Sequence, residues 1–316
     1  MRNKQVLAGS FAAATLFAGV AVSAVGNGPA PDETSPQTVA ANAVDESKWP
    51  NRTPERGLAK GLSLPVEKYL VGYTDVVEWQ RAQRDLWVNC MARFGFDKFN
   101  PPVPGTNPPT EFNDANMPRR YGASDAAQAA AYGYHLPPEQ MDEPPVWEPA
   151  AGPEEDVFVG SGPELSGGTY NGAAVPEGGC RGETERQLGR LTQGEDASGI
   201  NASSMTESLQ RLAVQKGIAS WAACMKDKGY AYDSPFKPAE SFNLSTPTAS
   251  TEETEVATAD VACKSKTGLT ATWYAEETAI QDQKIANKKT SLEAALAKTN
   301  TIKAAAQRVV SEDANR

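Results

Sequence analysis

The sequence contains one histidine, His135, and any histidine-dependent catalysis would have to use it. A catalytic base needs a carboxylate that orients it and a nucleophile within reach. Glu139 and Asp142 follow closely and could supply the carboxylates of an envelope hydrolase. However, no G-x-S-x-G turn or comparable motif marks a nucleophile. We therefore favour a hydrogen-bonded loop histidine and keep a hydrolase that uses loop carboxylates with His135 as the alternative.

Aromatic side chains are spread through the proline-rich segment around this histidine. Together with His135 they could line a surface that binds a sugar or a peptide: Tyr121, Tyr132, Tyr134 and Trp147. The alternative is that the rings hold the loops against neighbouring helices. The acidic run at 154–156 lacks the spacing of a calcium-binding loop, and we expect a solvated loop there.

Several enzyme classes are excluded by the absence of their motifs. There is no P-loop, no G-x-G-x-x-G and no H-E-x-x-H sequence, so an ATPase, a Rossmann dehydrogenase and a zincin are ruled out. We predict no catalytic residue, no metal site and no cofactor. Acidic residues outnumber basic ones by 40 to 30, for a net charge of −10, which argues against a nucleic-acid partner.

The chain has four cysteines, none of them in the C-x-x-C spacing of a zinc ribbon or a thioredoxin-like site: Cys90, Cys180, Cys224 and Cys263. In an exported protein they favour disulfides, and an even number of four allows three pairings. A repeat helps to choose among these. The motif W-x-x-C-M-x-x-x-G-[FY] begins at Trp87 and again at Trp221, and each copy is followed by one more cysteine with a basic neighbour. The simplest pairing for two equivalent units is Cys90–Cys180 and Cys224–Cys263.

The motif itself is typical of a helix end. Tryptophan, cysteine and methionine at i, i+3 and i+4 share one helix face, and glycine at i+8 suits the left-handed residue just past the last turn. We expect its residues to be structural core instead of a ligand site: Trp87, Met91, Gly95, Trp221, Met225 and Gly229.

Residues 1–24 have the composition of a secretory signal peptide. Arg2 and Lys4 form a positive start, an uncharged stretch follows, and cleavage is expected near Ala24. The alternative is an uncleaved anchor, because the stretch is about long enough to span a bilayer. No later stretch of 18 apolar residues exists, so no membrane span is expected after cleavage. The sequence predicts a secreted or extracytoplasmic protein of the cell envelope.

Composition divides the rest of the chain into three parts. Residues 25–64 lack helical periodicity and are predicted to be a disordered linker. Residues 65–195 form a first helical disulfide unit with a proline-rich insertion, and residues 203–316 form a second one. The first unit should open with a long helix over 66–94. Its insertion should hold a short helix that follows Asp125, and another short helix should follow Cys180.

The second unit should open with a helix that is capped by Ser204 and Glu207 and should end in a long helix. From about 258 to 310 the chain has no proline and one glycine, with a narrow apolar stripe. Such a stripe suggests coiled-coil-like packing, either within the chain or against a partner that docks through residues 270–310.

Several short sequences resemble those of a known group of proteins. They accompany the two motif copies and cover Arg119-Arg120-Tyr121-Gly122, Tyr132-Gly133-Tyr134-His135-Leu136, Asn171-Gly172 and Val175-Pro176-Glu177-Gly178-Gly179-Cys180. Over roughly residues 66–290, the chain resembles exported proteins of unassigned function from high-GC Gram-positive actinobacteria. The resemblance implies a Gram-positive envelope or extracellular setting and a genomic tie to efflux machinery, and it carries no activity.

The expected fold is mostly α, with disulfide-stapled helical hairpins in two similar units, long Pro/Gly-rich loops and a long C-terminal helix. The expected function is an exported, non-catalytic envelope protein that binds an envelope protein or a cell-wall component, as an accessory to a membrane complex.

Overall fold

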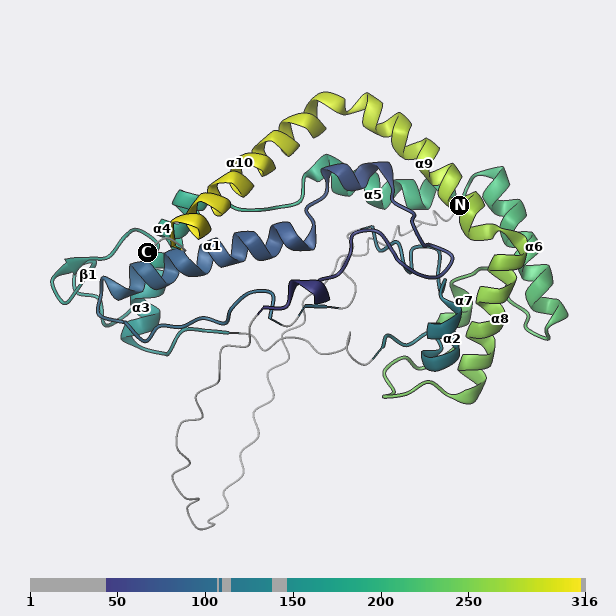
Figure 1. The fold of residues 1–316 in the computed structure, drawn as a ribbon, viewed down its shortest axis with the longest axis horizontal. Helices are drawn as coiled ribbons and strands as arrows, with labels where there is room; N and C mark the ends of the chain where they lie inside the picture. The colour runs from purple at the N-terminus through teal and green to yellow at the C-terminus, as the bar shows by residue number, and fades with distance from the viewer. Residues whose placement is uncertain (1–43, 107, 110–114, 138–146, 314–316) are drawn as a thin grey trace, which may run out of the picture. The chain divides into compact units, whose positions relative to one another are not determined.

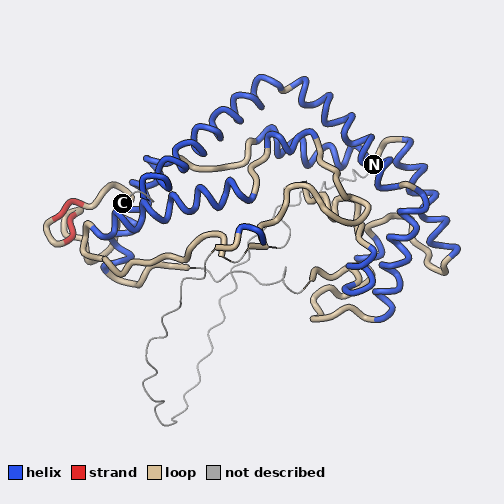
Figure 2. Tube along the Cα trace, viewed as in Figure 1, coloured by secondary structure: helices blue, strands red, loops and turns tan. Residues whose placement is uncertain are grey.

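The computed structural model describes residues 44–106, 108–109, 115–137 and 147–313, and these residues are mostly helical (Figures 1 and 2). The predicted signal peptide, the linker up to residue 43, Glu139 and Asp142 lie outside the described residues. The α-helices of the described part are α1 (Tyr73–Ala92), α2 (Ala126–Tyr132), α3 (Pro153–Val159), α4 (Gly179–Leu188), α5 (Glu195–Ser208), α6 (Leu212–Asp227), α7 (Lys237–Glu240), α8 (Thr251–Thr267), α9 (Leu269–Asn287) and α10 (Lys289–Asp313).

Shorter elements complete the described part. Two 3-10 turns, η1 (Glu46–Lys48) and η2 (Pro65–Tyr69), precede α1. A small antiparallel hairpin joins β1 (Thr169–Tyr170) to β2 (Ala173–Ala174), with Thr169 opposite Ala174. Its two-residue turn, Asn171-Gly172, has positive φ at both positions, which is the backbone that a tight hairpin needs.

The long helix that the sequence predicts over 66–94 begins later, at Tyr73. Residues 65–69 form the 3-10 turn η2, and Leu70 has extended backbone. Gly72 is the N-cap of α1, and its amide donates to Asp75 Oδ2 at 3.1 Å. Proline at the start of η2 and the cap at Gly72 therefore divide the apolar pattern into two elements.

Both copies of the repeated motif end their helices in the same way. Gly95 and Gly229 have φ of 86° and 94°, a region that favours glycine. The amides of Phe96 and Tyr230 donate back to the carbonyls of Met91 and Met225, at 3.2 and 2.9 Å. These bonds satisfy carbonyls that the last turn would leave without partners.

The predicted disulfides are confirmed: Cys90 bonds Cys180, and Cys224 bonds Cys263. The first bond ties the last turn of α1 to the first turn of α4. The second joins the last turn of α6 to α8. α8 begins at Thr251, earlier than the predicted 258, so Cys263 lies near the end of this helix and not at a helix start.

Three groups of buried apolar residues form the core. The largest is centred on Trp221, Met225, Leu269 and Trp273. A second surrounds the first disulfide and includes Met91, Phe94, Phe99, Val157 and Phe158. A third lies where α1 contacts α10 and α4, at Ala82, Leu188 and Ala306. Trp87 is only partly buried, whereas Met91, Trp221 and Met225 are fully buried.

Two segments that the sequence presents as loops pack against the helices. The disordered-linker prediction does not hold for residues 44–64, because Leu64 is buried and Leu58 and Leu62 pack against the largest core. The proline-rich segment contributes α2, which packs against α8 and is capped by Asp125 as the sequence predicts. These loops therefore cover helices that would otherwise expose apolar side chains.

The second half begins with α5, which spans Ser204, so the predicted cap at this residue is wrong. Ser204 is fully buried in the helix and donates to Glu277 at 2.7 Å. The predicted C-terminal helix is divided in two: a left-handed Gly268 precedes α9, and Lys288 separates α9 from α10.

Helices from both halves of the sequence are in contact. α10 runs beside α1 (Figure 1), where Lys303 pairs with Asp75 at 2.5 Å. Within the chain, the buried stripe of α9 and α10 contacts α5, α6, α1 and η2. The division at residues 195–203 and the coiled-coil assignment stay predictions. In the part of the chain that the structure describes, no helix is long and apolar enough to cross a membrane.

Candidate functional site

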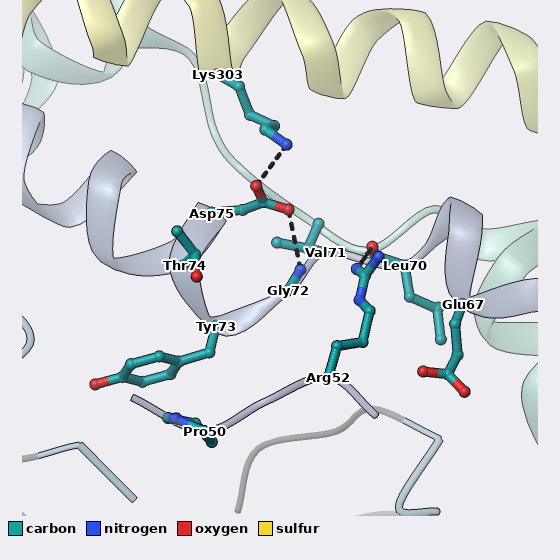
Figure 3. A pocket seen from close by; sticks show the side chains of 10 residues that line it. All are labelled: Pro50, Arg52, Glu67, Leu70, Val71, Gly72, Tyr73, Thr74, Asp75 and Lys303. Atoms are coloured by element: carbon teal, nitrogen blue, oxygen red, sulfur yellow. Dashed lines mark hydrogen bonds and ion pairs between the residues drawn. The ribbon is translucent and has the colours of Figure 1, made fainter. Parts of the chain in front are cut away.

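A small cleft opens where the chain enters α1 (Figure 3). Its volume is approximately 240 Å³. Residues 50–52, the end of η2, the first turn of α1 and one lysine of α10 form its walls.

Four charged side chains line the cleft, two of each sign. Arg52 donates to the carbonyl of Leu70 at 2.6 Å. Lys303 pairs with Asp75, and Glu67 accepts the Leu64 amide at 2.7 Å (Figure 3 shows Lys303 pointing at Asp75). The charges therefore balance within the cleft, and each of these side chains has a partner in the chain.

The cleft wall also carries two hydroxyl groups, of Tyr73 and Thr74. Burial raises the pKa of Tyr73 above its ordinary value, so its phenol stays neutral at physiological pH and acts as a hydrogen-bonding group. No histidine or cysteine lines this cleft. Its side chains can orient a small polar ligand that carries charges of both signs.

His135 lies elsewhere, buried between α8 and the loop before it. Its Nδ1 is 2.8 Å from Glu253 Oε1, and its Nε2 is 2.9 Å from the carbonyl of Thr246. Nε2 also lies 3.2 Å from the hydroxyl of Thr246, so both ring nitrogens are engaged within the chain. The side chain is 4% exposed, which supports the hydrogen-bonded histidine that the sequence analysis favoured. Its carboxylate partner is Glu253, which is distant in sequence.

A second buried group of polar side chains surrounds Glu277 of α9. Arg120 donates from Nε at 2.9 Å and from Nη2, and Tyr121 and Ser204 donate their hydroxyls at 2.8 and 2.7 Å. Glu277 is fully buried and Arg120 is 9% exposed. Burial, followed by the charge of Glu277, raises the pKa of Tyr121 far above its ordinary value. This arrangement ties the proline-rich segment to α5 and α9.

A third buried group is centred on Asp260 of α8. Lys264 donates to Oδ2 at 3.0 Å, the indole of Trp221 donates to Oδ1 at 2.8 Å, and Tyr134 donates at 3.3 Å. Burial raises the pKa of Asp260 and lowers that of Lys264, while the attraction between the two charges opposes both changes. Lys264 also donates to the carbonyl of Ala123 at 3.0 Å, so this group fixes the loop before α2.

The aromatic residues predicted to line a binding surface are packed against the fold. Tyr121 and Tyr134 are 2% and 3% exposed, and Tyr132 is partly buried. Trp147 stacks on Trp87 with ring centres 6.3 Å apart, next to Phe158. The structure brings Tyr134 and His135 together around α8, whereas Trp147 lies with the first disulfide. A binding role for these residues stays a prediction.

The acidic run at 154–156 is not a solvated loop. It forms the first turn of α3, where acidic residues are favoured, and Asp156 is 7% exposed. Asp156 accepts the amide of Glu164 at 2.8 Å. In the described ranges, no three histidine, cysteine or acidic residues are grouped so that they could hold a metal ion.

The comparisons with known proteins give no family for this chain. No family model matches it, and neither the curated proteins nor the solved structures contain a significant match.

Proposed function

We propose that this chain is an exported, non-catalytic binding protein of the cell envelope. Two disulfides support the extracytoplasmic setting, because such bonds form and persist in oxidising compartments. The signal-like composition of residues 1–24 points the same way. The resemblance to exported actinobacterial proteins, carried by the duplicated motif, suggests a Gram-positive envelope.

The proposal that the protein is non-catalytic rests on one observation: the side chains best suited to acid–base catalysis are hydrogen-bonded to other residues of the chain. His135, Asp260 and Glu277 are buried, and each is hydrogen-bonded to other residues of this chain. A catalytic acid or base must reach a substrate proton at hydrogen-bonding distance. These groups instead connect loops to helices, so binding is the function that the arrangement favours.

The cleft at the start of α1 is the ligand site that we propose. Ligand pockets for drug-sized molecules enclose roughly 300–1,000 Å³, so a cleft of approximately 240 Å³ suits one terminal group of a larger ligand. Two cations and two carboxylates in its walls favour a group with both signs of charge. A cell-wall peptide end, with its amine and carboxylate, has this chemistry.

A protein partner would use another surface. The apolar stripe of α9 and α10 is covered by helices of this chain, so a membrane-complex partner that docks on residues 270–310 would contact their polar outer face. Exposed residues there include Ala297, Thr301 and Ala304.

Cosedimentation with purified actinobacterial cell walls tests the proposal. The mature, oxidised chain should sediment with the walls and release no soluble sugar or peptide fragments. Lys303→Gln and Thr74→Val should weaken sedimentation, because both alter the cleft. Lys298→Gln is the matched control, since this exposed lysine of α10 does not line the cleft.

Two results would contradict the proposal. One is the release of wall fragments that a folded His135→Gln variant no longer produces, which would favour the hydrolase. The other is failure of the wild-type chain to bind either walls or envelope membranes.

A further inference from the structure

The two disulfides occupy the same place in the repeated motif but have opposite charges beside them. The third residue after Cys90 is Arg93, and the third residue after Cys224 is Asp227. Residues three apart on a helix lie on the same face. The duplication therefore supplies a natural comparison of two bridges with matched helix ends and reversed local charge.

At the first bridge, the arginine contacts the sulfur. Arg93 Nη2 lies 2.9 Å from Cys90 Sγ and also donates to Glu183 of α4, at 2.7 and 2.8 Å. The Arg93 side chain is 53% exposed, and the carboxylate of Glu183 offsets part of its charge. A cation beside a cysteine stabilises the thiolate over the thiol.

The second cysteines of the two bridges, Cys180 and Cys263, also differ in how far their surroundings stabilise a thiolate. Cys180 is the second residue of α4, a ten-residue helix, and the positive end of a helix dipole stabilises a thiolate. Cys263 lies in the last turns of α8, where the dipole is negative. Cys90 and Cys224 both lie in the last turn of their helices, so the dipole does not distinguish these two. Among the described residues, the contact of Arg93 with Cys90 is the only hydrogen bond to a disulfide sulfur.

We infer that Cys90–Cys180 has a higher reduction potential than Cys224–Cys263, so that a dithiol reduces it first at equilibrium, although all four cysteines are buried. Stabilising the thiolates stabilises the reduced form of a bridge, and this raises its reduction potential. The first bridge has Arg93 beside Cys90 and a helix start at Cys180, whereas the second bridge has no such cation contact and Cys263 lies near a helix end.

The exchange is a two-step transfer of electrons from a dithiol reductant. A thiolate of the reductant attacks Cys90 Sγ; the bond to Cys180 breaks, and Cys180 leaves as a thiolate with the electron pair. The second thiolate of the reductant then attacks the first sulfur of the reductant, which is bonded to Cys90 in the mixed disulfide. This breaks the bond to Cys90 and releases Cys90 as a thiolate beside Arg93. Two electrons have passed to the protein, and the reductant leaves as its disulfide. Reduction detaches α4 from the end of α1.

The test uses the full mature chain, equilibrated with mixtures of reduced and oxidised dithiothreitol. Acid quenching, alkylation and peptide mass spectrometry then measure each cysteine pair separately, and circular dichroism follows the fold at each mixture. Cys90–Cys180 should be half reduced at a lower proportion of reduced dithiothreitol than Cys224–Cys263. Arg93→Gln should require about tenfold more reductant for the first bridge, equivalent to about 30 mV.

Three further variants separate local charge from general destabilisation. Glu183→Gln should shift the first bridge in the opposite direction, because it removes the carboxylate that offsets Arg93. Asp227→Arg should make the second bridge easier to reduce. Arg181→Gln removes a charge next to Cys180 that has no described contact with a sulfur. It should change the proportion of reduced dithiothreitol needed to half-reduce the first bridge by less than about twofold.

Two outcomes would overturn the inference. The first is reduction of Cys224–Cys263 at the same or a lower proportion of reductant than Cys90–Cys180. The second is an equal effect of Arg93→Gln and Arg181→Gln, which would show that the contact with Cys90 does not set the potential.

Discussion

Replacing Glu277 with glutamine tests whether the buried carboxylate holds the proline-rich segment to the helices. The substitution keeps the side-chain volume but removes the charge that Arg120 contacts, and it places an amide donor where donors already converge. Removing one partner of a buried ion pair costs about 3–5 kcal/mol, because the other charge stays buried. We expect Glu277→Gln to lower the free energy of unfolding by this amount.

The chain offers an exposed ion pair of the same helix, α9, as a control. Lys284 of α9 pairs with Glu207 of α5 at 2.6 Å, but the Glu207 side chain is 51% exposed. Exposed pairs contribute about 0–1 kcal/mol, so Lys284→Gln should cost little. Arg120→Met combined with Glu277→Gln should cost less than the sum of the two single changes, since neither charge is then left unpaired.

Urea unfolding of the oxidised mature chain, followed by circular dichroism and tryptophan fluorescence, gives these free energies where the two signals coincide. A cost for Glu277→Gln below about 1 kcal/mol, or one equal to that of Lys284→Gln, would refute the reasoning. It would mean that the apolar contacts of the segment hold it in place without the ion pair.

Three other predictions concern separate parts of the fold. Burial, followed by neighbouring carboxylates, raises the pKa of Tyr121 and Tyr134 above the ordinary value of 10. Above pH 10 the unfolded chain therefore loses these protons while the folded chain keeps them, and the free energy of unfolding should fall as the pH rises. Absorbance at 295 nm should show that both tyrosines ionise only when the protein unfolds. Gly179→Ala should destabilise the protein more than Gly168→Ala in thermal unfolding, because both have positive φ but only at Gly179 would the added carbon meet backbone atoms, at 2.3 Å. Ser250→Ala removes the cap of α8 and should cost about 1 kcal/mol of stability in urea unfolding; no change would show that the cap is replaced by water.

The fold class and the disulfides could be predicted because local signals specify them. The repeat places Cys90 and Cys224 at equivalent helix ends. Both helices end just before a glycine, Gly95 or Gly229, that adopts the left-handed backbone. The start of α1 could not be placed in the same way. Val66 and Tyr69 continue the apolar pattern, so only the proline before them and the glycine at 72 indicate the break.

The partners of His135 and Arg120 could not be predicted from local sequence patterns, because they are distant in the sequence. Glu253 is 118 residues from His135, and Glu277 is 157 residues from Arg120. One signal was present in the sequence: Glu277 falls between Trp273 and Ile280 on the apolar face of its helix. A charge at such a position needs a buried partner, but the sequence does not say which loop supplies it.

The cleft could not be predicted at all, because its walls come from segments that the sequence assigns to a linker, a helix start and the C-terminal helix. Arg52 belongs to the predicted linker, and Lys303 belongs to α10. Only tertiary packing brings these charges together.

The contact between α1 and α10 has a consequence for how the protein is made. Gln307 of α10 donates to Glu78 of α1 across 229 positions of the sequence, so the ribosome completes one partner long after the other. During that interval Trp79 and Leu86 have no α10 residues to pack against. A newly synthesised chain therefore exposes this apolar face of α1 until α10, which begins at Lys289, has been made.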